Sequence, residues 1–437
     1  MRVVDRPVPT VGGHRPDVEP FPAVLYVGIE KQPVASYVYD DFTAFYDSPI
    51  TPPPYVYDDL QDWPYERMDL WCQLHGLTIT VGATDPDIGP DAGTVTMTLD
   101  NRDGQLSQYD AQGRLVDYFP GRALDIWAVH AGEAFWLWSG TITAWRERPD
   151  ETVEAEAFDV FSELNRDVAE WDPGLYGNTV VQRLDAICDE WNYTGRRRFT
   201  AGDVTLHSYF TQATPLEELR SVARSDGGMI LTDADGTLVY FNRFWALGRD
   251  DQPAVPVMSD NICTTPIIVW DAELSTDDDV IANIATLTNV AGETVTATNQ
   301  ASVDRYGPQT IPGRNDDQWI GTAAGTALAE HLVIRRGDGY LRLTGFALYL
   351  HDRRHDYWRT AIDLRIGDVI TFLHEQPSTT GPNLIALQLI VAHIVHDITP
   401  ETWVTTVATS RAVGAVTVLR YDRTSYRYDQ AGAIYAL

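Results

Sequence analysis

The 437-residue chain is short of positive charge. It contains a single lysine, Lys31, and its 32 basic residues face 63 acidic ones, giving a formal net charge of −31. A surface that grips nucleic acid needs clustered cations, and so does one that binds an anionic membrane. The composition therefore argues against both functions. The acid excess either only keeps the protein soluble or lines a passage that DNA crosses without sticking. One lysine beside many arginines is typical of a GC-rich genome.

Cysteine and long apolar runs are scarce as well. Cys72, Cys188 and Cys263 are far apart, odd in number and form no CxxC pair, so neither a disulfide framework nor a zinc ribbon is expected. The first twenty residues lack the apolar run of a signal peptide, and no stretch reaches the roughly 18 apolar residues of a membrane span. These absences predict a protein without a membrane span that is made and assembled in a cytoplasm.

Signatures of enzyme chemistry are missing too. The sequence has no P-loop, GxGxxG, GxSxG or HExxH motif. His351 and His355 have two arginines between them, and His393 and His396 would face opposite sides of a strand. Carboxylate pairs are expected by chance among 63 acids and do not indicate a glycosidase. We expect no catalytic residue, no cofactor and no bound metal.

The sequence is rich in aromatic residues and in alternating patterns. Thirteen Trp and 21 Tyr favour sheets, where flat rings pack well. Stretches such as "GTVTMTLDN" (93–101) and "TVEAEAF" (152–158) alternate polar and apolar residues and are separated by turn residues. The fold class predicted from these patterns is mainly β with a small α/β module.

Changes in composition and residue patterning divide the chain into five segments. Residues 1–22 are predicted to form an extended arm, and residues 412–437 a tail rich in Tyr and Asp. Residues 23–168 read as a compact antiparallel barrel or sandwich, and residues 256–411 as a second β-dominated domain with one helix. Residues 169–255 read as an α/β module between them.

Helix signals are clearest inside the α/β module. Thr214 caps a helix, with Pro215 in its first turn and Glu217 at the capping-box position, and Gly227 ends the helix. A hairpin turning at Asp235-Gly236 follows.

An acidic turn follows the first alternating stretch, at Asp100, Asn101, Asp103 and Gly104. A calcium loop of the EF type wants oxygen ligands at positions 1, 3 and 5 and Gly at 6, whereas this segment has Arg at position 3 and Gly at position 5. The cluster Asp85, Asp87 and Asp91 matches no known loop. We predict that the turn is a structural hairpin turn.

A low-complexity loop at residues 37–66 contains YVYDD twice, on either side of a Pro-Pro-Pro run that forbids helix. It is either a long exposed loop or an aromatic and acidic strip that docks on a partner subunit, since Tyr is favoured at interfaces. The C-terminal tail has the same composition. The candidate docking residues are Tyr37, Tyr39, Tyr55, Tyr57, Tyr421, Tyr426 and Tyr428.

Several passages, in order, resemble minor tail proteins, or tail (baseplate) hub proteins, of long-tailed bacteriophages that infect GC-rich hosts. "GTVTMTLDNRDGQLSQYD" resembles that family's "pGtatvtLdNrdGrfsPyn". The other matching passages are "YFPGRALDIWAV", "WLWSGTITAWRERP", "TPLEELRSVARSDGGMILTDADGTLVYFNR", "DVIANIATLTN", "ASVDRYGPQTI", "IGDVITFLHE" and "IVHDITPETWVTTVATS". Together they cover roughly residues 65–411; the YVYDD loop and the tail are not part of the family pattern.

The resemblance implies a structural protein of the virion at the distal tail tip, not an enzyme. It implies two barrels of the tail-tube fold flanking the α/β module, and a homotrimer whose six barrels form a ring. The implied partners are the distal tail protein and tail tube, the tape measure protein and central tip or fibre proteins. One alternative is the hexameric distal-tail adaptor. Another is a carbohydrate-binding or hydrolytic tip protein, since thirteen Trp could stack on sugars and a catalytic pair in a cleft would support it. Against it, five of them lie in strand patterns, where burial in the core is expected: Trp71, Trp127, Trp136, Trp138 and Trp145.

Overall fold

The computed structural model describes residues 23–30, 65–68, 74–82, 91–115, 119–130, 133–166, 169–171, 177–202, 204–207, 211–244, 255–260, 267–275, 281–311, 313–337, 342–350, 355–376, 383–411 and 417–419. The arm at residues 1–22 lies outside this part of the chain. So do all seven tyrosines proposed for docking: Tyr37, Tyr39, Tyr55, Tyr57, Tyr421, Tyr426 and Tyr428. Their role stays a prediction.

The elements fall into three groups along the chain. The first β region contains β1 (Ala23–Glu30), β2 (Tyr65–Met68), β3 (Leu74–Gly82), β4 (Thr94–Asp100), β5 (Ala123–His130), β6 (Glu133–Glu147) and β7 (Thr152–Phe158). The middle group contains α1 (Val160–Leu164), β8 (Ala169–Trp171), β9 (Asn178–Thr179), α2 (Val180–Glu190), β10 (Arg197–Phe199), β11 (Thr205–Leu206), β12 (Thr211–Ala213), α3 (Pro215–Ser225), β13 (Met229–Thr232) and β14 (Leu238–Phe241).

The last group is again rich in strands, with three helices among them. It contains β15 (Val257–Ser259), β16 (Ile267–Ile268), β17 (Trp270–Ser275), β18 (Ile284–Asn289), β19 (Thr294–Thr298), α4 (Gln300–Tyr306), β20 (Arg314–Asp317), α5 (Thr322–Arg336), β21 (Arg342–Tyr349), α6 (His355–Asp363), β22 (Val369–Gln376), β23 (Asn383–Ile398), β24 (Trp403–Arg411) and β25 (Thr417–Leu419). The chain is thus mainly β, as the sequence predicts.

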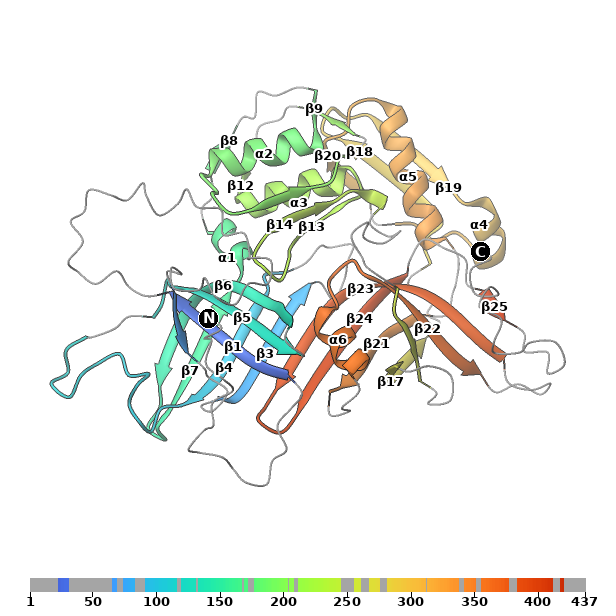
Figure 1. Ribbon diagram of the computed structural model, residues 1–437. Helices are drawn as coiled ribbons and strands as arrows, with labels where there is room; N and C mark the ends of the chain where they lie inside the picture. Colours follow the sequence, from blue (N-terminus) through green and yellow to red (C-terminus); the bar gives the residue numbers. More distant parts are fainter. Residues whose placement is uncertain are drawn as a thin grey trace.

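The strands of the first group and most strands of the last group join in one 15-stranded sheet (Figure 1), whereas β18, β19 and β20 form a separate three-stranded sheet. The joint is an antiparallel ladder between β3 and the C-terminal half of β23, which runs from Leu77 opposite Ile398 to Gly82 opposite His393. The other side of β3 pairs with β4. The apolar side chains of the two β regions accordingly belong to a single buried cluster. Two segments that are adjacent nowhere in the sequence therefore share both a sheet and a core.

The large sheet contains the same five-stranded unit twice. In the first β region the strand order is β3-β4-β7-β6-β5, and in the last group it is β17-β21-β24-β23-β22, antiparallel throughout. In each unit the three strands that come last in the sequence, β5 to β7 and β22 to β24, form a meander. The long strands β6 and β23 occupy the same place in the two units.

Local geometry supports this internal repeat. Gly121 and Gly367, with φ of +86° and +89°, each precede the third strand of their unit. Their N–H groups donate to the carbonyl oxygens of Ile142 and Val391, at 2.7 and 2.9 Å. Directly after these two residues, β6 and β23 each carry a bulge. Ile142 and Val391 are therefore equivalent positions, which fixes the register between the two units.

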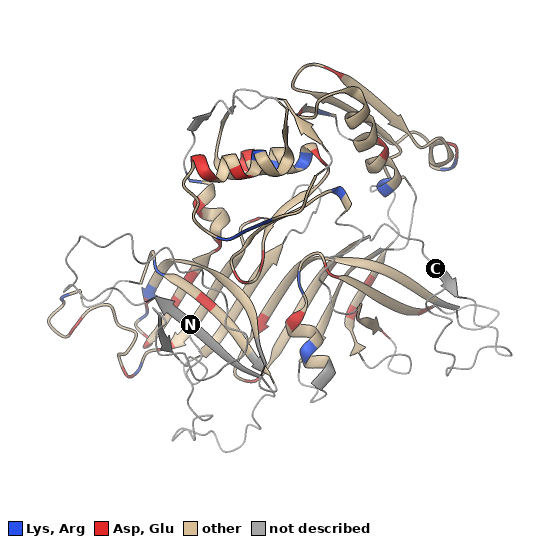
Figure 2. Ribbon diagram, turned by 45° about the horizontal axis from the view of Figure 1, so that its top comes forward, with Lys and Arg blue, Asp and Glu red and all other residues tan. Residues whose placement is uncertain are grey.

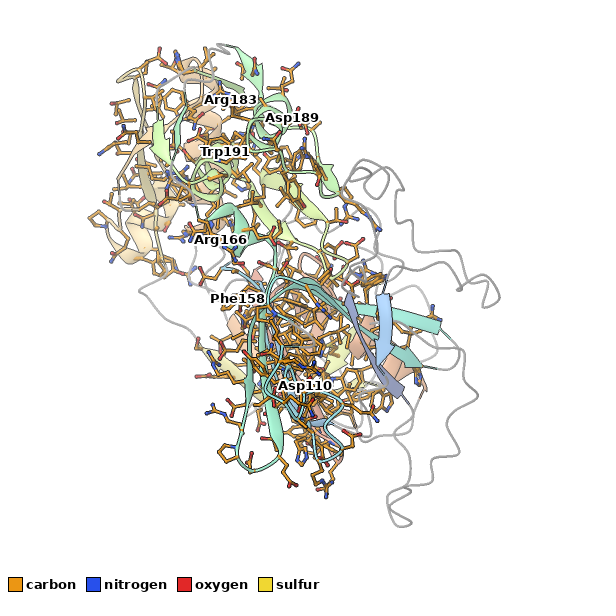
Figure 3. All side chains as sticks on the ribbon, turned by 90° about the vertical axis from the view of Figure 1, so that its left-hand side faces the viewer. Asp110, Phe158, Arg166, Arg183, Asp189 and Trp191 are labelled. Carbon is orange, nitrogen blue, oxygen red and sulfur yellow. The ribbon has the colours of Figure 1, made fainter. Side chains whose placement is uncertain are left out.

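A layer of helices and short strands lies over the large sheet and has a core of its own (Figures 1 and 3). Helix α3 begins as the sequence predicts: Thr214 Oγ1 accepts the N–H of Glu217, and the Glu217 carboxylate accepts the N–H of Thr214. Its C-cap is Asp226, followed by Gly227 with φ of +72°. The hairpin β13–β14 follows, with Gly236 at its turn.

The segment from β18 to α5 also packs in this layer. Residues 281–337 lie within the range 256–411 that the sequence assigns to a second β-dominated domain, yet their apolar side chains pack with α2 and α3. The buried residues they contribute are Ala282, Ala285, Leu287, Val295, Ala297, Ile311, Trp319, Leu328, Ala329, Leu332 and Val333. The domain boundaries drawn from the sequence stay a proposal.

The hairpin β13–β14 connects this layer to both β regions. Asp233, at its turn, accepts a hydrogen bond of 2.7 Å from Arg198 and lies 3.6 Å from Arg365, which follows α6. Val81 of β3, Leu231 of β13 and Ile394 of β23 line one small cavity beside it. The hairpin thus lies where the two repeats and the upper layer meet.

The joint between β3 and β23 depends on Gly82. This residue has φ of +92°, and a Cβ atom added there would lie 2.3 Å from the carbonyl oxygen of Ala392, in the bulge of β23. We predict that Gly82→Ala lowers the free energy of unfolding by roughly 2–4 kcal/mol, from positive φ and overpacking combined. Denaturant unfolding measures it. Gly113→Ala is the matched control, because Gly113 has φ of +73° with nothing within 4 Å; equal losses would contradict the prediction.

Candidate functional site

Strand alternation puts different side chains on the two faces of the central sheet. Leu77, Ile79, Val95, Met97 and Leu99 point into the core and are at most 3% exposed. The opposite face, here termed the threonine face, is polar. It is made by Thr78 and Thr80 of β3, Thr94, Thr96 and Thr98 of β4, Thr152, Glu154 and Glu156 of β7, Val395 and Asp397 of β23, and Val404 and Thr406 of β24.

The threonine face runs without a break across the joint between the two repeats. Thr78 lies opposite Thr96 on one side and Asp397 on the other, and its hydroxyl donates to the Asp397 carboxylate at 2.8 Å. Glu156 lies opposite Thr96 in the next strand. These residues line a shallow open hollow that extends to Glu154. A hydrogen bond between side chains thus supports the joint on this face.

The charge of this face is acidic at its centre. Strands β3, β4, β7 and β23 contain no Lys or Arg (Figure 2). Glu154, Glu156 and Asp397 lie on the face, since each is opposite one of its threonines. The cations stand at one margin: Arg146 pairs with Glu156 at 2.5 Å, and Arg148 pairs with Glu154. The bond to Arg146 lowers the pKa of Glu156. Both arginine side chains are about half exposed, so these pairs add little stability.

The acidic turn after β4 is held by its own side chains. Asn101 Oδ1 accepts the N–H of Leu106, Asp103 accepts the N–H of Gln105, and Gly104 has φ of +72°. The hydrogen bond from Arg102 lowers the pKa of Asp100 to about 2. Among the described residues, no group of three or more His, Cys, Asp or Glu side chains is placed to hold a metal ion.

The turn does not have the hairpin geometry that the sequence analysis expects. Both edges of β4 are already taken, by β3 and β7, so the returning chain has no edge on which to pair. Instead it crosses the end of the sheet, and Leu106 is fully buried there. The indole of Trp145 donates to the carbonyl oxygen of Leu106 at 3.1 Å. Whether the turn has any role beyond structure stays a prediction.

The buried polar groups of the upper layer are tied to one another. Arg183, on α2, is fully buried and donates to Gln318 at 3.1 Å and to the carbonyl oxygen of His207 at 3.0 Å. Gln318 donates in turn to Glu218 of α3 at 3.2 Å. Figure 3 shows Arg183 within the packed upper layer. This network holds α2, α3 and the strand segment after β20 together, which is a structural task.

The tryptophans that the strand patterns predict to be buried do lie mostly in the core. Trp127, Trp138 and Trp145 are at most 7% exposed, and Trp136 is half-buried; Trp71 lies outside the described residues. A buried indole cannot stack on a sugar. Within the described part of the chain, only Trp270 has a largely exposed indole, at 52%.

The histidines considered as ligands are also separated. His396 is buried, with Thr405 Oγ1 2.9 Å from its Nδ1 atom. His393 is half-buried at the other end of the same ladder, and His351 lies outside the described residues. The side chain of His355 is likewise not described.

Sequence reasoning missed the threonine face itself. The alternation in β4 and β7 is visible in the sequence. The strand that lies beside β3 is not, because Thr78 and Asp397, which meet there, are 319 residues apart in the chain. The signal that could have found it is the combination of three alternating strands without a cation.

Comparisons with known proteins agree on the fold. No protein-family model matches the chain, and no curated protein sequence does. Among solved structures, it resembles the tail protein from Neisseria meningitidis MC58, with TM-score 0.55, 12% identity and coverage of 89% of this chain and 96% of that chain. It also resembles the 43 kDa tail protein of prophage MuSo2 from Shewanella oneidensis, with TM-score 0.54, 15% identity and coverage of 90% and 100%. The chain therefore has the fold of phage tail proteins.

One further structural finding concerns membranes. Within the described residues, no helix combines the length and the apolar character that crossing a bilayer requires.

Burial of His396 makes the joint sensitive to acid. Burial lowers the pKa of this imidazole from 6.5 to about 4, so the unfolded chain binds its proton before the folded one does. Stability is therefore lost as pH falls from 6.5 to 4, by about 3 kcal/mol for a shift of this size. We predict that His396→Gln, which keeps a hydrogen-bonding group, removes that loss.

Denaturant unfolding at pH 7 and pH 4.5 measures the effect as the difference between the two proteins. The pH dependence of the wild-type protein alone does not isolate His396. Burial also raises the pKa of Asp159 to about 7, and this carboxyl makes the folded state more stable as pH falls. Equal pH dependence of wild type and His396→Gln would contradict the prediction.

Proposed function

We propose that this chain is a non-enzymatic structural protein of a phage tail tip. It forms a hub ring that joins the tail tube and distal tail protein to the central tip or fibre, and it lines the passage for DNA. The same role implies contact with the tape measure protein and a location at the distal end of the virion. No cofactor is needed for it.

The observation that carries this proposal is the threonine face. A surface past which DNA slides must not bind phosphate, and four of its strands contain no Lys or Arg. Its carboxylates repel phosphate, while its threonines keep it wetted. A chain with net charge −31 and the fold of phage tail proteins fits such a lining.

The internal repeat supports a ring of three chains. Each chain supplies the five-stranded unit twice, so three chains supply six similar positions on which a sixfold tube can sit. Closed assembly also removes sheet edges that would otherwise aggregate.

The distal-tail adaptor is the alternative within the same class, with six chains in the ring. A carbohydrate-binding or hydrolytic tip protein is the alternative from another class. The burial of Trp127, Trp138 and Trp145 leaves fewer indoles that could stack on a sugar, which favours the structural role.

We predict that the isolated protein assembles into particles of three copies. Mass photometry of the purified chain measures the copy number, and a reconstruction of the tail tip places the ring. Six copies in one ring would favour the distal-tail adaptor and defeat the hub proposal.

We also predict that the assembled protein gives no shift with duplex DNA at low salt, because the face it presents is acidic. The double variant Thr96→Lys and Asp397→Lys serves as the positive control, since it places cations at the centre of the same face. A salt-sensitive complex with the wild-type protein would defeat the proposed lining role.

A further inference from the structure

Two of the strand edges that have no strand partner in the described part of the chain belong to the five-stranded units. β17 pairs with β21 on one side only. β6 pairs with β7 along its C-terminal half, while its ladder with β5 stops at Thr141, opposite the first residue of β5. The other side of residues 143–147 therefore has no strand beside it among the described residues. Exposed edges of this kind are templates for pairing with another chain.

The internal repeat shows what these two edges are equivalent to. Within the chain, β3 pairs with the side of β23 that becomes free beyond Val391. β17 occupies the place of β3 in the second unit, and β6 occupies the place of β23 in the first. The contact that joins the repeats within one chain therefore has a second, open counterpart made by β17 and β6.

The register of the first strand carries over between the units. Thr78 lies opposite Thr96, and Glu273 lies opposite Gly345. Thr96 and Gly345 occupy the same place in β4 and β21, because their partners in β7 and β24 are equivalent. Glu273 is thus the counterpart of Thr78.

The register of the long strand carries over as well. Trp145 and Ile394 each lie three residues beyond the equivalent positions Ile142 and Val391, and they face β7 and β24 in the same way. Asp397, which accepts the hydrogen bond of Thr78 within the chain, lies three residues further on. Its counterpart three residues beyond Trp145 is Arg148.

The two counterparts have opposite charge. Glu273 is exposed on β17, and the Arg148 side chain is 46% exposed directly after β6. Arg148 already pairs with Glu154 of its own sheet, but a guanidinium has five N–H donors and can serve two carboxylates. Opposite charges placed directly across two strands stabilise their pairing.

We infer that residues 273–275 of β17 in one copy pair antiparallel with residues 146–148, at the end of β6, in a second copy of this chain, with Glu273 opposite Arg148. The inference rests on the proposed ring and names the contact that closes it. Each copy gives one edge and receives the other, which is a head-to-tail contact that closes when the rotation per copy allows it. The threonine face then continues from one chain to the next.

Disulfide trapping tests the contact directly. Residues opposite each other on antiparallel strands have Cβ atoms about 4.5–5.5 Å apart, near the range that a disulfide spans. Full-length Glu273→Cys and Arg148→Cys proteins are mixed at micromolar concentration and oxidised with copper phenanthroline. We expect a dimer on a non-reducing gel from the mixture, and products of up to three chains from the double variant.

Two matched pairs control the register and the reagent. Glu147→Cys replaces Arg148→Cys in the mixture: Glu147 is the adjacent residue but points to the opposite face, so its yield should fall at least tenfold. Thr78→Cys with Asp397→Cys in one chain should link within that chain and run as a monomer. Wild type under the same oxidation reports the background of the native cysteines.

Charge reversal provides the second measurement. Arg148→Glu should raise the dissociation constant of the assembly at least tenfold, and adding Glu273→Arg should restore it. Three-copy particles that form without the 148–273 disulfide and ignore the charge reversal would overturn this inference while leaving the hub proposal intact. A protein that stays monomeric and gives no disulfide would overturn both, whereas a disulfide within six-copy particles would support the contact and defeat the hub proposal.

Discussion

The ladder between β3 and β23 is the constraint on which the rest of the structure depends. It merges the two β regions into one sheet and one core, and it places Thr78 beside Asp397. Without it, the threonine face would be two separate surfaces at an undefined angle. The close approach of Gly82 to Ala392 and the burial of His396 lie along the same ladder, so packing and protonation both act on it.

The upper layer contacts both β regions and so stabilises their relative position. The hairpin β13–β14 reaches the last β region through Asp233, which lies near Arg365 and also binds Arg198 of the upper layer itself. It reaches the first β region through Leu231, which lines a small cavity with Val81 of β3. The layer itself is fixed by buried polar contacts around Arg183 and Gln318. Such contacts are directional, and leaving one partner unpaired in the core is costly. These hydrogen bonds therefore favour one arrangement of the layer, in which they all form together.

Local signals in the sequence predicted local structure well. The capping box of Thr214 and Glu217 and the hairpin turn at Gly236 are where the residue types demand them. Pairings between distant segments were beyond reach, because alternation in β3 states which side chains share a face but not which strand lies beside it. The same limit explains the turn at Gly104, since its hairpin geometry depends on whether β4 has a free edge. It also explains Trp319, whose burial with α2 and α3 follows from long-range packing.

Carrying the five-stranded unit twice in one chain has a genetic consequence. In a ring of identical single units, every mutation appears at all positions at once, and both sides of each contact change together. Here Thr78 and Glu273 are equivalent in place but encoded separately, as are Asp397 and Arg148. One unit can therefore acquire a neutral hydrogen-bonding edge while the other acquires a charged one. Selection can then change each of the two contacts without changing the other.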